Sequence, residues 1–383
     1  MSLYIKNGTI ITPQQQLTDH VVLVENNRIT DIGTAEQVPC PAEAQVVDAD
    51  GLLITPGFID LQLNGAFGLD FTADPTTLWE VAAKLPRYGV TSFLPTVITA
   101  PPEKRALAQT VITEQRPADY QGTTPLGLHF EGPFFNPAKK GAHNKNYICL
   151  PNFELTDNWS PETGVRLVTM APEMENALPV IRALVERGVV VSAGHSMANY
   201  DEAKTSFNAG VRYGTHLFNA MPPLHHRDPG LPGALLSDSR PVVGLIADGI
   251  HVHPGLVDMV WQTLGAERLN LVTDAMAALG MPPGQFELGD YKVTVTETSA
   301  RLANGTLAGS ILAMDEALRN LIAYTACSLK EALPTITSTP ARLLGLSDTI
   351  GQVAVGYHAD LALLTPDYQV AMTIAQGNIV YQT

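Results

Sequence analysis

Residues 189–216 read VVVSAGHSMANYDEAKTSFNAGVRYGTH and decide the fold of this chain. The runs VVVSAGH (189–195) and VRYGTH (211–216) are typical of short buried strands, and the stretch NYDEAKTSFNAG between them has helical character. A strand, a helix and another strand in succession favour a parallel sheet, because parallel strands need a long crossover between them. Each run ends in a histidine, so a polar side chain stands where the expected strand stops.

The same alternation extends through the middle of the chain, where eight short runs are rich in Val, Ile, Leu, Phe and Thr. The runs are GFIDLQLNG (57–65), TSFLPTV (91–97), LGLHFEG (126–132), VRLVTMAPE (165–173), VVVSAGH (189–195), VRYGTH (211–216), VVGLIADG (242–249) and LNLVTDA (269–275). Eight repeats predict an α/β fold in which the strands close into a (β/α)₈ TIM-type barrel. An open doubly wound sheet is the alternative.

The two ends of the chain have a different pattern. Short alternating runs broken by Asn-Gly, Asn-Asn and Asp-Gly fill the first fifty residues, and similar runs return in the last forty. Neither end is large enough to form a good core alone. We therefore expect residues 1–55 and 345–383 to pair into one small β-sandwich or β-barrel-like domain, with the barrel of residues 56–344 inserted between them.

The composition is that of an ordinary globular protein and narrows the choice of partners. Of 383 residues, 45% are hydrophobic and 16% are charged, and the formal net charge is −15. Such a surface repels nucleic acid and anionic membranes, so neither is expected as a partner. The three cysteines are scattered, and the sequence has neither a signal-peptide pattern nor a run of ~20 apolar residues, which favours a cytoplasmic location.

Glu131, His195 and His216 each stand at or next to the end of one of the eight runs. A closed barrel brings its strand ends together, and a carboxylate with two imidazoles can hold one divalent metal while leaving a coordination position open. No cysteine stands near them, so Zn²⁺ is the expected ion, although Fe²⁺ suits the same ligands. The alternatives are a structural salt bridge for Glu131 and hydrogen-bonded core or turn positions for the histidines.

Asp274 stands at the end of the last run, which neighbours the first run in a closed barrel. A carboxylate beside a metal-activated water can take a proton from it and later give that proton to a leaving group. The alternative is a helix N-cap, but AMAALGMPPG, which follows, is a poor helix.

Three more candidates stand on expected loops, where binding residues are frequent. His143 and His251 follow the third and seventh runs, and Arg227 lies in the segment HHRDP. A guanidinium close to imidazoles suits a phosphate group. Taken singly, each of the three is also explained as a solvated surface residue.

Eight segments stand in order between residue 56 and about residue 310. They are PGFIDLQLNG, LGLHFEGPFFNPAKKGAHN, VTMAPE, SAGHS, THLFNAM, DGIHVHP, LVTDAM and NGTLAGS. Together they resemble the amidohydrolase superfamily, and within it the enzymes that deacetylate phosphorylated amino sugars. The resemblance implies hydrolysis of the N-acetyl group of N-acetylglucosamine 6-phosphate to glucosamine 6-phosphate and acetate, in amino-sugar catabolism. It also implies a homodimer.

The resemblance assigns roles to these residues and to others. Glu131, His195 and His216 would hold the metal, and Asp274 would act first as general base and then as general acid. His143 would polarise the acetamide carbonyl and stabilise its oxyanion. The expected substrate contacts are Ala142, His143, Asn219, Ala220, His251, Leu307, Ala308 and Gly309. Of these, Asn219, Ala220 and His251 would contact the sugar phosphate, which Arg227 would reach from the neighbouring subunit.

The chain also departs from the superfamily pattern. Many amidohydrolases carry His-x-His at the end of the first strand, where this chain has Gln62 and Asn64, and a bridging lysine on the fourth, which VRLVTMAPE lacks. Amides are weak ligands, so Gln62 and Asn64 are expected to mark a vestigial second-metal position, with one metal per subunit. Ala308 stands where serine is expected, which would remove one substrate hydrogen bond.

Other functions stay open on the sequence. They are deacetylation of the galactosamine epimer, hydrolysis of another amide on the same barrel, and a non-catalytic scaffold. The non-catalytic scaffold is disfavoured because the three expected metal ligands and the expected general base, Asp274, are all present.

Overall fold

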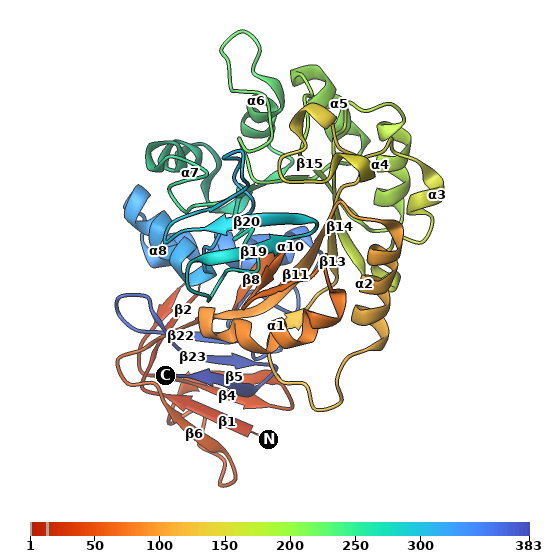
Figure 1. Cartoon of the computed structure of the whole chain (residues 1–383). Helices are drawn as coiled ribbons and strands as arrows, with labels where there is room; N and C mark the ends of the chain where they lie inside the picture. The colour runs from red at the N-terminus through yellow and green to blue at the C-terminus, as the bar shows by residue number, and fades with distance from the viewer. Residues whose placement is uncertain (1, 13–14) are drawn as a thin grey trace.

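The computed structural model describes residues 2–12 and 15–383 and places a parallel barrel at the centre of the molecule (Figure 1). The barrel strands are β8 (Phe58–Leu63), β11 (Val90–Ile98), β13 (Leu128–Glu131), β14 (Val165–Met170), β15 (Val190–Ala193), β16 (Tyr213–Gly214), β17 (Val242–Leu245) and β18 (Leu269–Leu271). Each strand pairs in parallel with the next one in this order. The eight predicted runs are therefore confirmed as eight strands of one sheet.

The sheet closes where the last strand meets the first. Ala275, just after β18, forms a parallel bridge with Leu63 of β8. The Asn64 N–H donates to the Ala275 carbonyl, and the Asp274 N–H donates to the Gln62 carbonyl, both at 2.8 Å. An open sheet would leave these two edges unpaired, so the barrel prediction is confirmed and the open-sheet alternative is wrong. Closure therefore places the residues at the carboxyl end of β18 beside those at the carboxyl end of β8.

Helices surround the barrel (Figure 1). The α-helices are α1 (Leu78–Lys84), α2 (Pro102–Glu114), α3 (Phe153–Thr156), α4 (Ala177–Glu186), α5 (Tyr200–Ala209), α6 (Gly230–Ser237), α7 (Pro254–Arg268), α8 (Met314–Thr325), α9 (Leu329–Ala332) and α10 (Ser338–Leu343). The 3₁₀ turns are η1 (Pro75–Thr77), η2 (Leu85–Tyr88), η3 (Pro137–Lys139), η4 (Lys145–Tyr147), η5 (Pro161–Thr163) and η6 (Leu333–Ile336). Among the described helices, none combines the length and the apolar character needed to cross a bilayer.

Helix α5 shows how local sequence sets an element. Asn199 caps its first turn by accepting from the Glu202 N–H, while the Glu202 side chain accepts from the Asn199 N–H. This reciprocal pair of hydrogen bonds satisfies two backbone N–H groups that have no acceptor within the helix. Gly210 ends the helix with φ of 119°, a left-handed conformation that glycine adopts without steric cost. The apolar side chains Ala203 and Phe207 pack inward, which fixes the connection between the two histidine-bearing strands.

The two ends of the chain share a sheet below the barrel (Figure 1). Its strands, in spatial order, are β24 (Asn378–Gln382), β23 (Val370–Ala375), β22 (Leu361–Leu364), β7 (Leu53–Pro56), β2 (Thr9–Ile11) and β3 (Gln16–Leu17). A second sheet holds β5 (Arg28–Thr34), β4 (His20–Glu25), β1 (Ser2–Lys6) and β6 (Gln45–Asp48). The division of the chain at residues 55/56 and 344/345 stays a prediction, and residues 1, 13 and 14 lie outside the described part.

The remaining strands are short and stand beside the barrel. They are β9 (Gly65–Ala66), β10 (Leu69–Asp70), β12 (Thr124–Pro125), β19 (Gly284–Leu288), β20 (Tyr291–Val295) and β21 (Ala300–Arg301). The last three form an antiparallel three-stranded excursion between β18 and α8.

Asp60 is a buried carboxylate on β8 whose titration links pH to stability. It accepts from the Thr273 hydroxyl at 2.6 Å and from the backbone N–H groups of Gln62 and Thr273. Burial raises the pKa of Asp60 from 3.8 to about 7. Because the folded-state pKa is the higher one, the ionised form is disfavoured in the fold, and stability is lost as the pH rises from about 4 to about 7.

Asp60→Asn removes this titration while keeping a neutral side chain of the same shape. We expect the variant to gain on the order of 4 kcal/mol over the wild type between pH 4 and pH 7, since each pKa unit corresponds to about 1.4 kcal/mol. Urea midpoints of both proteins across this range measure the effect, with the exposed Asp119→Asn as control. A difference between Asp60→Asn and wild type that stays constant with pH would contradict it.

Candidate active site

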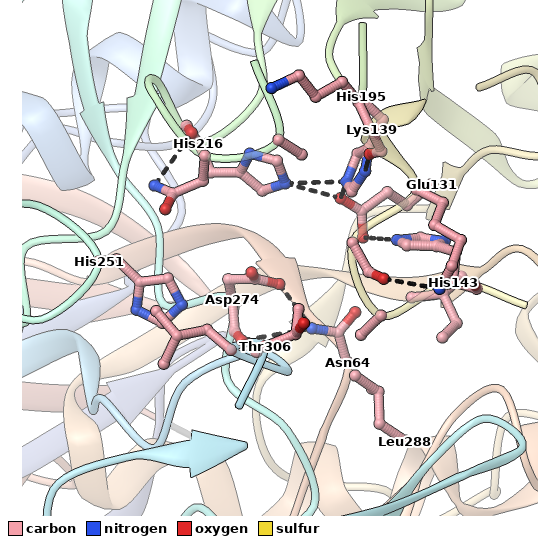
Figure 2. A pocket seen from close by; sticks show the side chains of 18 of the residues that line it. Asn64, Glu131, Lys139, His143, His195, His216, His251, Asp274, Leu288 and Thr306 are labelled. Carbon is pink, nitrogen blue, oxygen red and sulfur yellow. Dashed lines mark hydrogen bonds and ion pairs between the residues drawn. The ribbon is translucent and has the colours of Figure 1, made fainter. Parts of the chain in front are cut away.

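Three polar side chains converge at the carboxyl ends of β13, β15 and β16. Glu131 Oε1 lies 3.2 Å from His195 Nε2 and 3.2 Å from His216 Nε2, and the two imidazole nitrogens lie 3.1 Å apart (Figure 2). All three residues are at most 4% exposed. One atom from each could serve as a ligand to the same metal ion. The sequence prediction therefore names residues that the fold brings together.

The hydrogen bonds of His195 indicate what this cluster is built to hold. Its Nδ1 lies 2.9 Å from the carbonyl oxygen of Lys139, which can only accept, so Nδ1 carries the proton and Nε2 offers a lone pair. That lone pair faces the carboxylate of Glu131, and two acceptors repel one another unless a cation stands between them. The donor set of one carboxylate and two imidazoles fits a divalent ion such as Zn²⁺.

The charge of Glu131 supports the same conclusion. Burial alone would raise its pKa, but hydrogen bonds from the facing imidazoles of His195 and His216, donated when those rings are protonated, outweigh burial and hold the pKa of Glu131 well below its usual value. Glu131 is thus an anion within an enclosed site, and Gln62 Nε2 donates to its Oε1 at 2.9 Å.

The backbone bends sharply at the two histidines of this cluster and at Asp274, the expected general base. His195, His216 and Asp274 have φ values of 49°, 30° and 48°, in the left-handed region that residues with side chains rarely adopt. Each follows a barrel strand by two or three residues. Such conformations cost on the order of 1 kcal/mol or more and are frequent where side chains are aimed into a site.

Asp274 faces the three-residue cluster from across the pocket (Figure 2). Its Oδ1 accepts from Asn64 Nδ2 at 2.7 Å and from Gln62 Nε2 at 3.1 Å. Burial, followed by the nearby charge of Glu131, raises the pKa of Asp274 above its usual value. Among the described residues no donor bonds to Oδ2, which leaves that oxygen for the pocket. Gln62 and Asn64 thus orient the carboxylate, a contact that the sequence did not reveal.

His143 is held as a neutral hydrogen-bond donor. The Thr99 backbone N–H lies 3.3 Å from His143 Nδ1, and because an N–H can only donate, Nδ1 accepts and Nε2 carries the proton. Burial holds the pKa of His143 well below its usual value. His143 Nε2 lies 3.8 Å from Glu131 Oε2, so the donor stands beside the cluster.

A cavity of about 410 Å³ opens over these residues and is large enough for a sugar-sized molecule. The predicted residues that line it are Asn64, Glu131, Ala142, His143, His195, His216, Asn219, Ala220, His251, Asp274, Leu307 and Gly309. Ala308 is fully buried between the two lining residues of its loop. Arg227 is exposed on its loop, 2.9 Å from His226 Nε2, and is not among the lining residues. Gln62 is fully buried and is not among the lining residues.

His251 is fixed from behind by Asp248. The Asp248 carboxylate lies 2.6 Å from His251 Nδ1 and accepts from the backbone N–H groups of Ile250 and His251, both at 2.8 Å. Burial alone would raise the pKa of Asp248, but its bond to His251 outweighs burial and lowers it. The pair keeps the imidazole turned toward the cavity that it lines.

Sequence reasoning did not single out several lining residues. They are Ile98, Ala138, Lys139, Lys140, Gly141, Leu288, Asn304 and Thr306. The two lysines could have been found, because KK is a rare pair of cations in a chain of net charge −15 and stands three residues before His143. Asn304 and Thr306 sit on a loop whose position depends on the β19–β21 excursion.

The barrel, the metal-binding cluster at its carboxyl end and the facing aspartate define the class of metal-dependent hydrolases built on this fold. Residues 53–380 match the family model described as the amidohydrolase family. The chain is 37% identical to N-acetylglucosamine-6-phosphate deacetylase of Bacillus subtilis, over 99% of this chain and 97% of that protein.

Solved structures agree with the sequence relatives. N-acetylglucosamine-6-phosphate deacetylase from Pasteurella multocida superposes with a TM-score of 0.92 at 33% identity, covering 99% of both chains. A mutant of the enzyme from Mycobacterium smegmatis, in complex with N-acetyl-D-glucosamine-6-phosphate, gives a TM-score of 0.90 at 33% identity and covers 100% of both chains. This chain belongs to the amidohydrolase family, in the group formed by the N-acetylglucosamine-6-phosphate deacetylases.

Proposed function

We propose that this protein hydrolyses the N-acetyl group of N-acetylglucosamine 6-phosphate, giving glucosamine 6-phosphate and acetate. The observation that carries the proposal is the convergence of Glu131, His195 and His216 opposite Asp274 in one cavity. Relatives over nearly the whole chain carry the name of this activity. The reaction belongs to amino-sugar catabolism, and we place it in the cytoplasm.

Glu131, His195 and His216 would hold one divalent ion, which we propose to be Zn²⁺. When bound, such an ion supplies Lewis acidity and lowers the pKa of a water molecule toward 7. Gln62 and Asn64 offer a second ion only amide oxygens, so we propose a single metal per subunit, with these two residues positioning Asp274 instead.

The protein's own residues then direct the protons. Asp274 takes a proton from the attacking water as the water oxygen bonds to the acetyl carbon. His143 donates its Nε2–H to the carbonyl oxygen, where negative charge develops. Asp274 gives the proton to the amide nitrogen as the C–N bond breaks. One water and one amide are consumed, and acetate and the protonated amine are released.

Substrate contacts follow from the cavity lining. We propose that Ala142, Asn219, Ala220, His251 and the loop of residues 307–309 surround the sugar. The buried Ala308 contributes shape to this loop, since its methyl group can donate no hydrogen bond.

Acetate release from a panel of sugars tests the function. The panel contains N-acetylglucosamine 6-phosphate, its galactosamine epimer and unphosphorylated N-acetylglucosamine, with metal content measured on the same sample. We expect the first to have the highest kcat/KM. A higher value for the epimer would assign the other substrate, and no acetate from any sugar would overturn the proposal.

Arg227→Ala tests the proposed second subunit. Arg227 stands outside the cavity of its own chain, and we propose that it reaches the phosphate in the site of a partner copy. Loss of a charge-assisted hydrogen bond is worth roughly 1.5–3 kcal/mol, so KM for the phosphorylated sugar should rise about tenfold or more. Arg182→Ala, on the exposed face of α4, serves as control. An unchanged KM would move phosphate binding elsewhere.

A further inference from the structure

Glu173 is a carboxylate that the proposed mechanism does not use. It ends the segment VTMAPE, three residues past β14, and is not among the residues that line the cavity. Its Oε1 accepts from the Met197 backbone N–H at 2.6 Å and from Asn136 Nδ2 at 3.1 Å. Its Oε2 accepts from the Ser196 hydroxyl at 2.7 Å. One side chain therefore joins the loops that follow β13, β14 and β15.

Two of these bonds brace the turn that carries His195. Ser196 and Met197 follow His195 directly in the chain. The Ser196 hydroxyl, which donates to Glu173, also accepts from the Ala198 N–H at 2.9 Å. His195 has a φ of 49°, a conformation that persists only where the surrounding structure imposes it. Glu173 supplies part of that constraint from outside the cavity.

The third bond reaches the loop that orients the His195 ring. Asn136 Nδ2 donates to Glu173, while the Asn136 backbone N–H donates to the His195 carbonyl at 3.0 Å. Asn136 is the N-cap of η3, and Lys139, the last residue of η3, accepts from His195 Nδ1 through its carbonyl (Figure 2). The Lys139 ammonium group donates in turn to the Met221 carbonyl at 2.7 Å. Glu173 is therefore bonded on both sides of His195.

A carboxylate suits this position because it only accepts, so its two oxygens receive all three donors at once. Hydrogen bonds to an ionised acceptor are also about twice as strong as those between neutral groups. Alanine at position 173 would remove every one of these acceptors. Glutamine would keep the oxygen that Met197 and Asn136 share, and the Ser196 hydroxyl could turn to accept from its NH₂ group. The two variants thus separate loss of the hydrogen bonds from loss of the charge alone.

We infer that Glu173 is a positioning residue of the metal site, which holds His195 so that its Nε2 faces Glu131 Oε1 at 3.2 Å. This inference rests on the proposed metal site and deepens it. Glu173 acts through the His195 turn, without contact to the sugar pocket. Groups that orient metal ligands typically contribute 10- to 100-fold to metal affinity, because a misdirected ligand binds poorly.

The test measures Zn²⁺ affinity in Glu173→Ala, Glu173→Gln and the control Glu175→Ala, an exposed residue of the same loop. Competition with a chromogenic chelator gives the Kd, and urea unfolding gives the midpoint of each metal-free protein. We expect Glu173→Ala to raise the Kd about 10- to 100-fold while its metal-free form still unfolds cooperatively. Glu173→Gln should stay within about threefold of wild type, and Glu175→Ala within about twofold. At saturating Zn²⁺, KM for N-acetylglucosamine 6-phosphate should change less than about twofold in all three, because neither position lines the cavity.

A Kd for Glu173→Ala equal to that of Glu175→Ala would overturn the inference. A raised KM with an unchanged Kd would overturn it too, since Glu173 would then act on the substrate. If Glu173→Ala does not fold, Ser196→Ala takes its place: it removes one of the three bonds and should raise the Kd about fivefold. An unchanged Kd in that variant would be equally contrary. A wild-type protein that binds no Zn²⁺ would instead overturn the proposed metal site.

Discussion

Replacing Asp274 by asparagine is expected to lower kcat by about 10³-fold, within the range by which a general acid–base group accelerates a reaction. The carboxylate faces the metal-binding cluster and its Oδ2 is free of donors from the described residues, so it can receive a proton. An asparagine can still accept from Asn64 and Gln62 through its oxygen and tolerates the left-handed backbone of this position. Its NH₂ group cannot take the proton.

The Asp274→Asn protein should therefore fold normally and keep its metal. Acetate release, metal content and thermal stability are measured on one preparation, with the exposed Asp119→Asn as a matched control. If Asp274→Asn retains turnover within tenfold of wild type, another group moves the proton.

Replacing Glu131 by glutamine is expected to weaken metal binding by more than ~100-fold and to abolish turnover. Even partners of metal ligands typically contribute 10- to 100-fold, and Glu131 is the only anion of the proposed ligand set. Glutamine keeps the size of the side chain but offers a neutral oxygen, so the lone pair of His195 loses the charge that draws a cation between them.

Metal content after dialysis and kcat are the readouts for Glu131→Gln. Glu80→Gln, an exposed residue of α1 that pairs with Lys84, is the control. A Glu131→Gln protein that retains a full equivalent of tightly bound metal would remove Glu131 from the site.

Much of the fold could be read from the sequence because parallel barrel strands are buried on both faces. Such strands appear as continuous apolar runs, and all eight runs became strands in the predicted order. The residues at their ends were predictable for the same reason. Apolar segments are interrupted by Glu131, His195 and His216. The barrel brings Glu131 Oε1 within 3.2 Å of Nε2 of each histidine.

The remainder depends on contacts between distant loops, which sequence spacing does not encode. Gln62 and Asn64 were expected as a vestigial metal position, yet their amides bond to Asp274, 210 residues or more away in the chain. The anchoring of Lys139 to Met221 joins loops after different strands. The placement of Arg227 depends on a second subunit and stays a prediction.

Titration of the metal-free protein with Zn²⁺ while acetate release is followed tests the central claim most directly. With one ion held by Glu131, His195 and His216 in each chain, activity on N-acetylglucosamine 6-phosphate should rise linearly and level off at one equivalent. Full activity in the metal-free protein, or a rise that continues to two equivalents, would contradict the single-metal site.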